Sequence, residues 1–186
     1  MKAAALYSIF PTAAGHCAIA WTNVGVVRLQ LPMSDATEAE QQLAKRLQHL
    51  QAALPTPEIA SIIEAIQRYF AGERSDFSNV RIDLRGHNEL FVQLYEKLQQ
   101  IRWGQTTTYG ALAKEIGAGP ETARAVGAAM AKNPVPLIIP CHRVLAAGGK
   151  IGGFSAPGGI GTKHHMLKLE GIRVGPPESP QQMLEL

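Results

Sequence analysis

Residues 107–132 have the pattern of two helices joined by a glycine turn, and this pattern restricts the fold more than any other feature of the chain. Residues 107–116 predict a short helix with a threonine cap, and residues 117–119 turn the chain. Pro120 suits the first turn of a second helix, which we expect to run to about Lys132. A helix, a glycine turn and a helix at this spacing are typical of a helix-turn-helix.

The second of these helices has two distinct faces. Its core-facing positions recur at the helical repeat and are Ala123, Val126, Gly127 and Met130. The other face has one long arginine among small side chains, and its residues are Arg124, Ala125, Ala128 and Lys132. Small residues let a helix approach a nucleic-acid strand closely, so this face is a candidate DNA-binding surface. A solvated face with one arginine is the alternative, and it is commoner among proteins in general.

Residues 1–84 predict a small α/β domain without evident chemistry. Apolar and polar residues alternate over residues 17–31, which indicates a hairpin. Helical patterns follow over residues 37–50 and, after a proline-rich break, over residues 57–70. Residues 80–84 have the pattern of a returning strand.

A second, helical domain is expected over residues 85–175, followed by a tail over residues 176–186. Asn88 caps its first helix, whose apolar positions continue to Ile101. The stretch at residues 148–161 is rich in glycine. No Lys-Ser/Thr pair follows it, so a phosphate-binding P-loop is excluded. A flexible wall beside the site is the better interpretation. The last helix contains Lys163, Leu167, Leu169 and Glu170 and is capped at Gly171.

Residues 133–140 predict a stiff, largely extended lead into Cys141, because they contain three prolines. A thiol held in this way is a candidate nucleophile, although it needs help to ionise at neutral pH. His142 can supply that help, and adjacent side chains point in different directions, so a bridging water is more plausible than direct contact. For an isolated Cys-His pair, a buried inert thiol would be the better interpretation.

The charge of the chain is uneven. Residues 97–175 carry ten Lys/Arg and three Glu, a net +7, whereas the other residues carry a net −4. A basic half suggests a polyanionic partner, although the signal is weak alone. The sequence has no apolar run long enough to cross a membrane and no secretory signal pattern. With only Cys17 and Cys141 available for a disulfide, we expect free thiols in the cytoplasm.

Several segments together resemble the O6-alkylguanine-DNA alkyltransferases, also called methylated-DNA–protein-cysteine methyltransferases. The resemblance covers residues 85–172 well and the N-terminal domain only in general shape. Its motifs occur in the family's order and are Tyr109-Gly110-Ala111-Leu112-Ala113, Ala123-Arg124-Ala125-Val126-Gly127, Asn133-Pro134, Ile139-Pro140-Cys141-His142-Arg143-Val144, Gly152-Gly153-Phe154-Ser155 and Leu169-Glu170-Gly171. It implies an α/β fold with a ribonuclease H-like N-terminal domain and a C-terminal helix-turn-helix domain.

The resemblance also implies a reaction. Cys141 would accept the alkyl group of O6-alkylguanine, or of O4-alkylthymine, irreversibly and in a single turnover. His142 would act as a base through a water molecule, and Glu170 would orient the histidine. Asn133 would tie the helix to the site, and Tyr109 would help to rotate the nucleotide. A phenol such as Tyr109 could also protonate the leaving guanine.

The implied partner is double-stranded DNA, which the protein would contact through the minor groove. We expect no cofactor and no membrane association. The protein is expected to be a monomer, with or without cooperative binding along DNA. Arg124 would enter the base stack as the lesion flips out, since the base cannot be reached within a duplex. The other implied DNA contacts are Tyr109, Ala125, Ala128, Lys132 and Arg143. The implied substrate pocket is formed by Val144, Phe154, Ser155, Met130 and Pro136.

The sequence departs from the family pattern at the pocket wall. Phe154 stands where many members have tyrosine, Ala156-Pro157 replaces a glycine pair, and residues 158–161 have the pattern of a small insertion. Some relatives bind zinc in the N-terminal domain. Here the available side chains are those of His16, Cys17, His49 and His87, and their spacing is poor, so we expect no metal.

Three other functions are each compatible with part of the sequence. A Cys-His-Glu hydrolase would use the same residue types, but it predicts turnover and leaves the helix-turn-helix unexplained. An alkyltransferase-like protein binds alkylated DNA without repairing it and lacks the acceptor cysteine, whereas Cys141 is present here. A plain DNA-binding regulator would have no need of the segment at residues 140–143.

Overall fold

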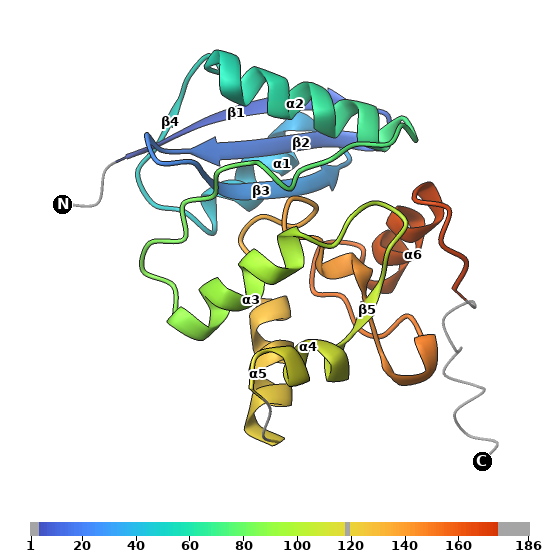
Figure 1. Cartoon of the computed structure of the whole chain (residues 1–186). Coiled ribbons are helices and arrows are strands. Elements are labelled where there is room, and N and C mark those ends of the chain that lie inside the picture. Colours follow the sequence, from blue (N-terminus) through green and yellow to red (C-terminus); the bar gives the residue numbers. More distant parts are fainter. Residues whose placement is uncertain (1–3, 118–119, 175–186) are drawn as a thin grey trace.

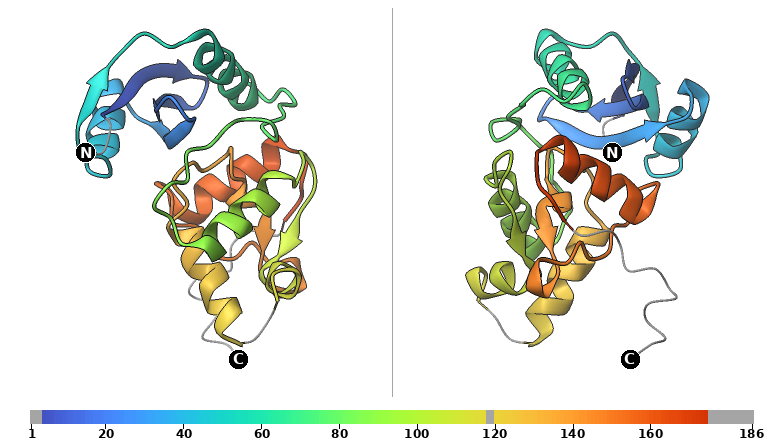
Figure 2. Two further views of the ribbon diagram at one scale, coloured as in Figure 1. Left: turned by 60° about the vertical axis from the view of Figure 1, so that its left-hand side comes forward. Right: turned by 90° about the vertical axis from the view of Figure 1, so that its right-hand side faces the viewer.

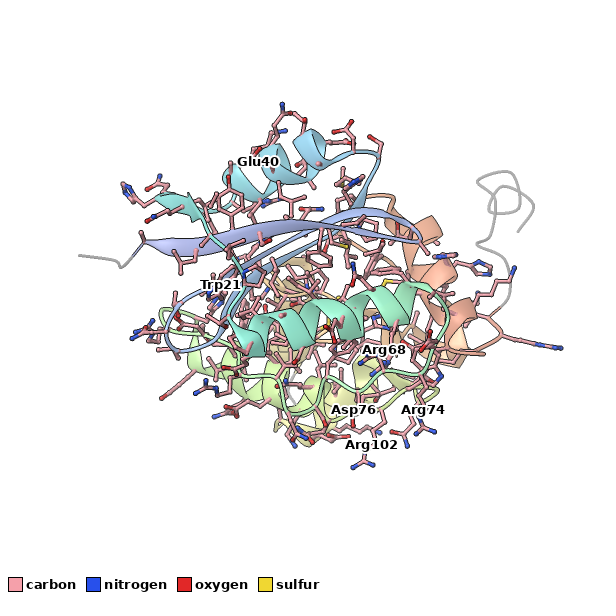
Figure 3. All side chains as sticks on the ribbon, turned by 90° about the horizontal axis from the view of Figure 1, so that it is seen from above. Trp21, Glu40, Arg68, Arg74, Asp76 and Arg102 are labelled. Carbon is pink, nitrogen blue, oxygen red and sulfur yellow. The ribbon has the colours of Figure 1, made fainter. Side chains whose placement is uncertain are left out.

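The N-terminal part is a four-stranded sheet with a helix on each face. The computed structural model describes residues 4–117 and 120–174 (Figure 1). The strands β1 (Ala5–Thr12), β2 (Gly15–Trp21), β3 (Val26–Met33) and β4 (Leu50–Ala52) lie in the order β3-β2-β1-β4. β2 pairs antiparallel with both neighbours, and β4 joins β1 in parallel. The helices α1 (Ala36–Ala44) and α2 (Pro57–Phe70) cover opposite faces (Figure 3).

Alternation along β2 explains why both faces are covered. Ala18 and Ala20 pack against Ala39 and Leu43 of α1. The alternate residues of β2, including Ile19, belong to the core on the α2 side. Successive strand residues point to opposite faces, so a strand that is apolar throughout needs a layer on each side. The hairpin predicted over residues 17–31 is confirmed as β2 and β3.

Two predictions in this part are wrong in extent. The helix expected over residues 37–50 ends at Ala44, and Leu50 belongs to β4 because the chain reverses at His49, where φ is 59°. The strand expected over residues 80–84 is a single bridge between Ile82 and Val26. The Val26 amide donates to the Arg81 carbonyl at 2.9 Å, an approach so close that only glycine fits at position 25.

The C-terminal part is mostly helical. It contains α3 (Glu89–Gln99), α4 (Tyr109–Glu115), α5 (Pro120–Ala131) and α6 (Gly159–Leu169). Two-residue strands β5 (Thr107–Thr108) and β6 (Val144–Leu145) pair in parallel (Figure 2). Short 3₁₀ turns, η1 (Cys141–Arg143) and η2 (Ala147–Gly149), flank β6. The expected caps are confirmed: the side chains of Asn88 and Thr108 accept backbone N–H groups of α3 and α4.

Helices α4 and α5 pack against each other, as the two-helix pattern predicts. Residues 118 and 119 of the expected turn, the side chain of Ala123 and the tail at residues 176–186 lie outside the described residues. On α5, Val126 and Met130 are buried as expected. Ala129, which was not predicted to face the core, is also buried.

The segment before Cys141 is not extended. It folds into a buried turn in which Pro136 bridges to Ile139 and Leu137 has φ 78°. The Asn133 amide donates to the Ile139 carbonyl at 2.8 Å, and its Oδ1 accepts the Val135 N–H at 3.0 Å. The two hydrogen bonds of the Asn133 side chain hold the segment in this turn, so the expectation of a largely extended segment is wrong.

The glycine-rich stretch is also shorter than expected. Gly158 has a left-handed conformation immediately before α6, and residues 159–161 form the first turn of that helix. Glu170 caps the helix and Gly171 follows with φ 73°, as the sequence predicts.

One apolar core joins the sheet part to the helical part. It contains residues from α2, α3, α5 and α6, including Ile66, Leu94, Val126 and Met166. Cys141 belongs to the same core. Over the described ranges, no helix is long and apolar enough to cross a membrane.

Candidate active site

Cys141 is the first residue of η1 and lies at a cavity of about 320 Å³. Cys141 is only 5% exposed, so the sulfur is reached through the cavity and not from an open surface. The cavity is lined by Tyr109, Gly127, Met130, Ala131, Gly153, Phe154 and Ser155. It is mostly apolar and large enough for a base-sized ligand.

The environment of Cys141 keeps its thiol protonated at rest. Burial raises the pKa of the thiol. A hydrogen bond from Asn133 and the positive charge of Lys163 act in the other direction without reversing the shift. The thiolate is the reactive form of cysteine, so this sulfur needs a base that removes its proton.

His142, Arg143 and Glu170 form a buried charged network beside the thiol. Glu170 Oε1 lies 2.6 Å from His142 Nε2, and Glu170 Oε2 accepts from Arg143 Nε at 2.8 Å. Arg143 Nη2 donates to Oε1 at 3.0 Å, which makes the arginine bidentate. Burial alone would raise the pKa of Glu170, but hydrogen bonds from His142 and Arg143, together with the charge of Arg143, lower it to about 2. The carboxylate is therefore ionised and balanced by the guanidinium.

The hydrogen bonds of Glu170 define the tautomer of His142. Burial lowers the pKa of His142, against the opposing effect of Glu170, so the imidazole is neutral at pH 7. An ionised carboxylate only accepts hydrogen bonds, so the proton of the neutral ring is on Nε2. Nδ1 then carries a lone pair, and it is buried without a hydrogen-bond partner among the described residues. Nδ1 of the residue that follows Cys141 is therefore able to accept a proton.

Tyr69 completes the network from the other part of the chain. It lies in α2, is fully buried, and donates its hydroxyl to Glu170 Oε1 at 2.9 Å. The same hydroxyl oxygen is 3.4 Å from His142 Nε2. Trp103 packs edge-on against the ring, with centroids 5.3 Å apart. Tyr69 was not predicted as a site residue, because on α2 it has the pattern of an ordinary core position and no motif surrounds it.

Lys163 is a second site residue whose role was not predicted. It lies in α6, is fully buried, and donates Nζ to the Val144 carbonyl at 2.6 Å. Burial lowers its pKa to about 8, although the neighbouring Cys141 acts in the opposite direction. A cation at this place favours the ionised form of the sulfur.

The structure brings some of the expected pocket residues to the cavity and places others elsewhere. Met130, Phe154 and Ser155, which were expected at the pocket, line it. Tyr109, which was expected to help rotate the nucleotide, lines it too. Pro136 lines an adjoining groove instead, and Val144 is fully buried with its carbonyl bound to Lys163.

Of the residues expected to face DNA, several are exposed and one is buried. Arg124 and Ala128 are exposed on α5, and Ala125 is half-buried. Lys132 is exposed just beyond the helix, and its Nζ lies 5.9 Å from the centroid of the Phe91 ring. Arg143 is the exception. Its side chain is 6% exposed and bound to Glu170, so the expectation that it contacts DNA is wrong. Its charge is needed inside, where it balances a buried carboxylate.

Within the described residues, no group of three His, Cys, Asp or Glu side chains is placed to hold a metal ion. Cys17 is buried in β2, where burial raises its pKa to about 12. Of the two thiols, only that of Cys141 lines the cavity described above.

Two family models cover most of the chain. Residues 5–84 match the ribonuclease-like domain of 6-O-methylguanine DNA methyltransferase, and residues 89–172 match its DNA-binding domain. A DNA base-flipping protein of Thermus thermophilus is 38% identical over 162 residues, which are 87% of this chain and 97% of that protein. A methylated-DNA–protein-cysteine methyltransferase of Mycolicibacterium paratuberculosis is 43% identical over 60% of this chain and 64% of its own length.

Solved structures agree with these matches. The Mycobacterium tuberculosis protein OGT in complex with DNA has a TM-score of 0.70 and 32% sequence identity, with 89% of this chain and 92% of that chain covered. The match includes the sheet part as well as the helical part. The chain therefore belongs to the family of 6-O-methylguanine DNA methyltransferases, the O6-alkylguanine-DNA alkyltransferases.

Proposed function

We propose that this DNA repair protein transfers the alkyl group of O6-alkylguanine, and of O4-alkylthymine, from duplex DNA to Cys141. The observation that carries the proposal is the position of Cys141, which lines a base-sized cavity and adjoins the His142–Glu170 pair. Family membership supports the same reaction class, and the matched relatives include methylated-DNA–protein-cysteine methyltransferases.

The geometry supports a mechanism in which His142 activates the sulfur. Nδ1 of the neutral imidazole takes the thiol proton through a water, and Glu170 stabilises the resulting imidazolium. The thiolate attacks the alkyl carbon, and the bond from that carbon to the guanine oxygen breaks. Tyr109 lines the cavity and supplies a proton to the leaving base. A thioether is a poor leaving group, so each chain reacts once.

For DNA binding we propose that α4 and α5 act as a helix-turn-helix whose exposed α5 face contacts the minor groove. Arg124 enters the stack where the damaged base has flipped out, which offsets part of the unstacking cost of a few kcal/mol. Ala125 and Ala128 allow close approach, and Lys132 meets phosphates. We further propose a cytoplasmic monomer with domains at residues 1–84 and 85–175.

The test is to mix the protein with a duplex that contains O6-methylguanine and to follow intact mass. We expect the added mass of one methyl group per chain, with a plateau however much duplex is supplied. Peptide mapping should locate the methyl on Cys141, and Cys141→Ala should abolish transfer. Methylated Cys17, or turnover beyond the plateau, would contradict the proposal and favour the hydrolase alternative.

A second function, base flipping without repair, is favoured by the name of the Thermus thermophilus relative. A protein of that kind would bind and flip the alkylated base but leave it intact. Duplex binding by wild type with no mass change on either component would establish this function instead. The presence of Cys141 at the cavity argues for transfer.

A further inference from the structure

A second hollow adjoins the base-sized cavity, between the sheet part and the helical part. It has a volume of about 320 Å³ and is here called the cation groove. The two hollows share a wall, because Met130, Ala131, Cys141 and Ser155 line both of them. From this wall the cation groove extends to β3 and to the residues just beyond α1. A ligand whose base fills the cavity can therefore place its outer atoms in the cation groove.

Three cationic residues line the cation groove. They are Arg28 of β3, Arg46 just beyond α1, and Lys132 just beyond α5. Among the described residues, no Asp or Glu lines the groove, and none of the three cations has a partner in an ion pair. Each cation comes from a different element, so it is the tertiary fold that concentrates the positive charge.

Arg28 lies close to another cation without an anion to balance it. It is half-buried, and its Nε is buried without a hydrogen-bond partner among the described residues. Burial, and then the charge of Arg46, lower the pKa of Arg28. Cations that are shielded from water are normally paired with an anion, because an unpaired charge is costly to desolvate. The groove is therefore suited to an anion that the described part of the chain does not supply.

The neighbouring helix α5 indicates where this anion comes from. Lys132 follows directly on α5, whose exposed face carries Arg124 and Ala128. That face is the proposed DNA-binding surface, and the cation groove continues it into the sheet part. A flipped nucleotide whose base fills the cavity remains joined to its strand by a phosphate on each side. A backbone phosphate is thus the anion that the proposed DNA binding brings to the groove.

We propose that the cation groove binds a backbone phosphate of the damaged strand next to the flipped nucleotide, so that the sheet part also contacts DNA. This proposal rests on the proposed function and deepens it. The guanidinium of an arginine matches the geometry of a phosphate, and Lys132 adds a point charge. Because the strand reaches the groove only when the base has entered the cavity, this contact stabilises the flipped state.

The experiment measures how the effects of Arg28 and of single phosphates depend on each other. Cys141→Ala is the background, because it leaves the O6-methylguanine of a bound duplex intact. Fluorescence anisotropy gives the affinity for a duplex with an unmodified backbone and for duplexes in which one phosphate beside the lesion is a neutral methylphosphonate. The substitutions Arg28→Gln, Arg28→Lys and Arg46→Gln are compared with a charge-matched control, Arg68→Gln. Arg68 is exposed on α2 and does not line the cation groove (Figure 3).

We expect Arg28→Gln to bind the unmodified duplex about tenfold more weakly, as for the loss of one hydrogen bond between charged groups. The slope of log affinity against log salt concentration should fall in magnitude by about one, because one fewer phosphate is neutralised. At one position beside the lesion, a methylphosphonate should weaken binding about tenfold with Arg28 present but less than about twofold in Arg28→Gln. This coupling identifies the phosphate that the groove binds, and Arg68→Gln should retain it.

Two further variants and a stability measurement separate charge from folding. Arg28→Lys keeps the positive charge and should retain most of the affinity, although lysine lacks the bidentate fork. Arg46→Gln removes an exposed cation and should weaken the coupling to the same phosphate. Arg28→Gln should unfold at the same temperature as the background or at a higher one, because it removes a charge that Arg46 repels.

Equal effects of every methylphosphonate with and without Arg28 would contradict the proposal. If inorganic phosphate then binds the protein without DNA, and binds Arg28→Gln more weakly, the groove is a site for small free anions instead. A lower unfolding temperature of Arg28→Gln with an unchanged salt slope would also overturn the proposal, because Arg28 would then be a structural residue. Wild type that binds the duplex but transfers no methyl group would contradict the proposed function, and the coupling would still test the groove.

Discussion

At the scale of single residues, the site depends on the ionised carboxylate of Glu170. Its carboxylate is fully buried and accepts from His142, Arg143 and Tyr69. Burying a carboxylate is costly unless it is paired and hydrogen-bonded, and here both conditions are met. The cationic charge stays on Arg143, so His142 remains neutral and can act as a base.

The pKa of Glu170 predicts a specific acid sensitivity. Because it is lowered from 4.5 to about 2, its contribution to stability is present above about pH 4.5 and is lost as the pH falls toward 2. A shift of this size corresponds to roughly 3 kcal/mol. We expect Glu170→Gln to be less stable at pH 7 and to lack this part of the acid dependence, as measured by urea unfolding at several pH values. A wild-type-like pH dependence in Glu170→Gln would contradict the assignment.

At the scale of secondary structure, α5 combines a buried face with an exposed one. Val126, Ala129 and Met130 are buried, whereas Arg124 and Ala128 are exposed. Met130 reaches the cavity next to Cys141, so the helix that would contact DNA also forms the wall of the reaction site. Chemistry and DNA binding can thus be separated only by substitutions on the exposed face.

The substitution Arg124→Ala separates DNA binding from the chemistry. Since Arg124 is exposed and does not line the cavity, its removal should reduce repair of duplex DNA at least tenfold, because unstacking a base costs a few kcal/mol. Reaction with free O6-alkylguanine base should stay within about twofold, because no base is flipped. Both rates are measured on one preparation. Parallel loss of the two rates would mean that Arg124 supports the fold or the cavity.

At the scale of the whole molecule, the sheet part contributes a side chain to the candidate active site through α2. Tyr69 is 101 positions away from Glu170 in the sequence, yet its hydroxyl bonds to the same carboxylate oxygen that holds His142. A backbone hydrogen bond from Leu29 of β3 to the Pro134 carbonyl, 3.1 Å long, joins the two parts at another point. The two parts are therefore expected to unfold together.

Tyr69→Phe tests this connection while keeping the ring packing. Loss of a buried hydroxyl bonded to a charged group should cost about 1.5–3 kcal/mol and slow methyl transfer. The pH at which the rate is half-maximal should also shift, because Glu170 Oε1 loses a donor. Tyr95→Phe is the matched control, since this buried hydroxyl donates to the Ala129 carbonyl at 2.7 Å and not to Glu170. An equal pH shift in both variants would mean that Tyr69 contributes only to packing.

The sequence by itself determined the local features of the protein. Helix α2 spans the predicted residues 57–70, and Asn88 and Thr108 cap helices where they were expected to do so. Cap geometry and helical periodicity depend on residues within a few positions of one another, so they can be read from a single chain. The motif around Cys141 also indicated the reaction class, because its residues are contiguous in the chain.

Only the tertiary structure decided which polar groups face inward. It turned Arg143 into the core, placed Tyr69 against Glu170, and gathered Arg28, Arg46 and Lys132 at one groove. It also folded residues 133–140 into a turn around Asn133, where local proline content predicted an extended segment. Buried polar groups must find partners wherever the fold supplies them, and those partners are distant in sequence, so no local pattern identifies them.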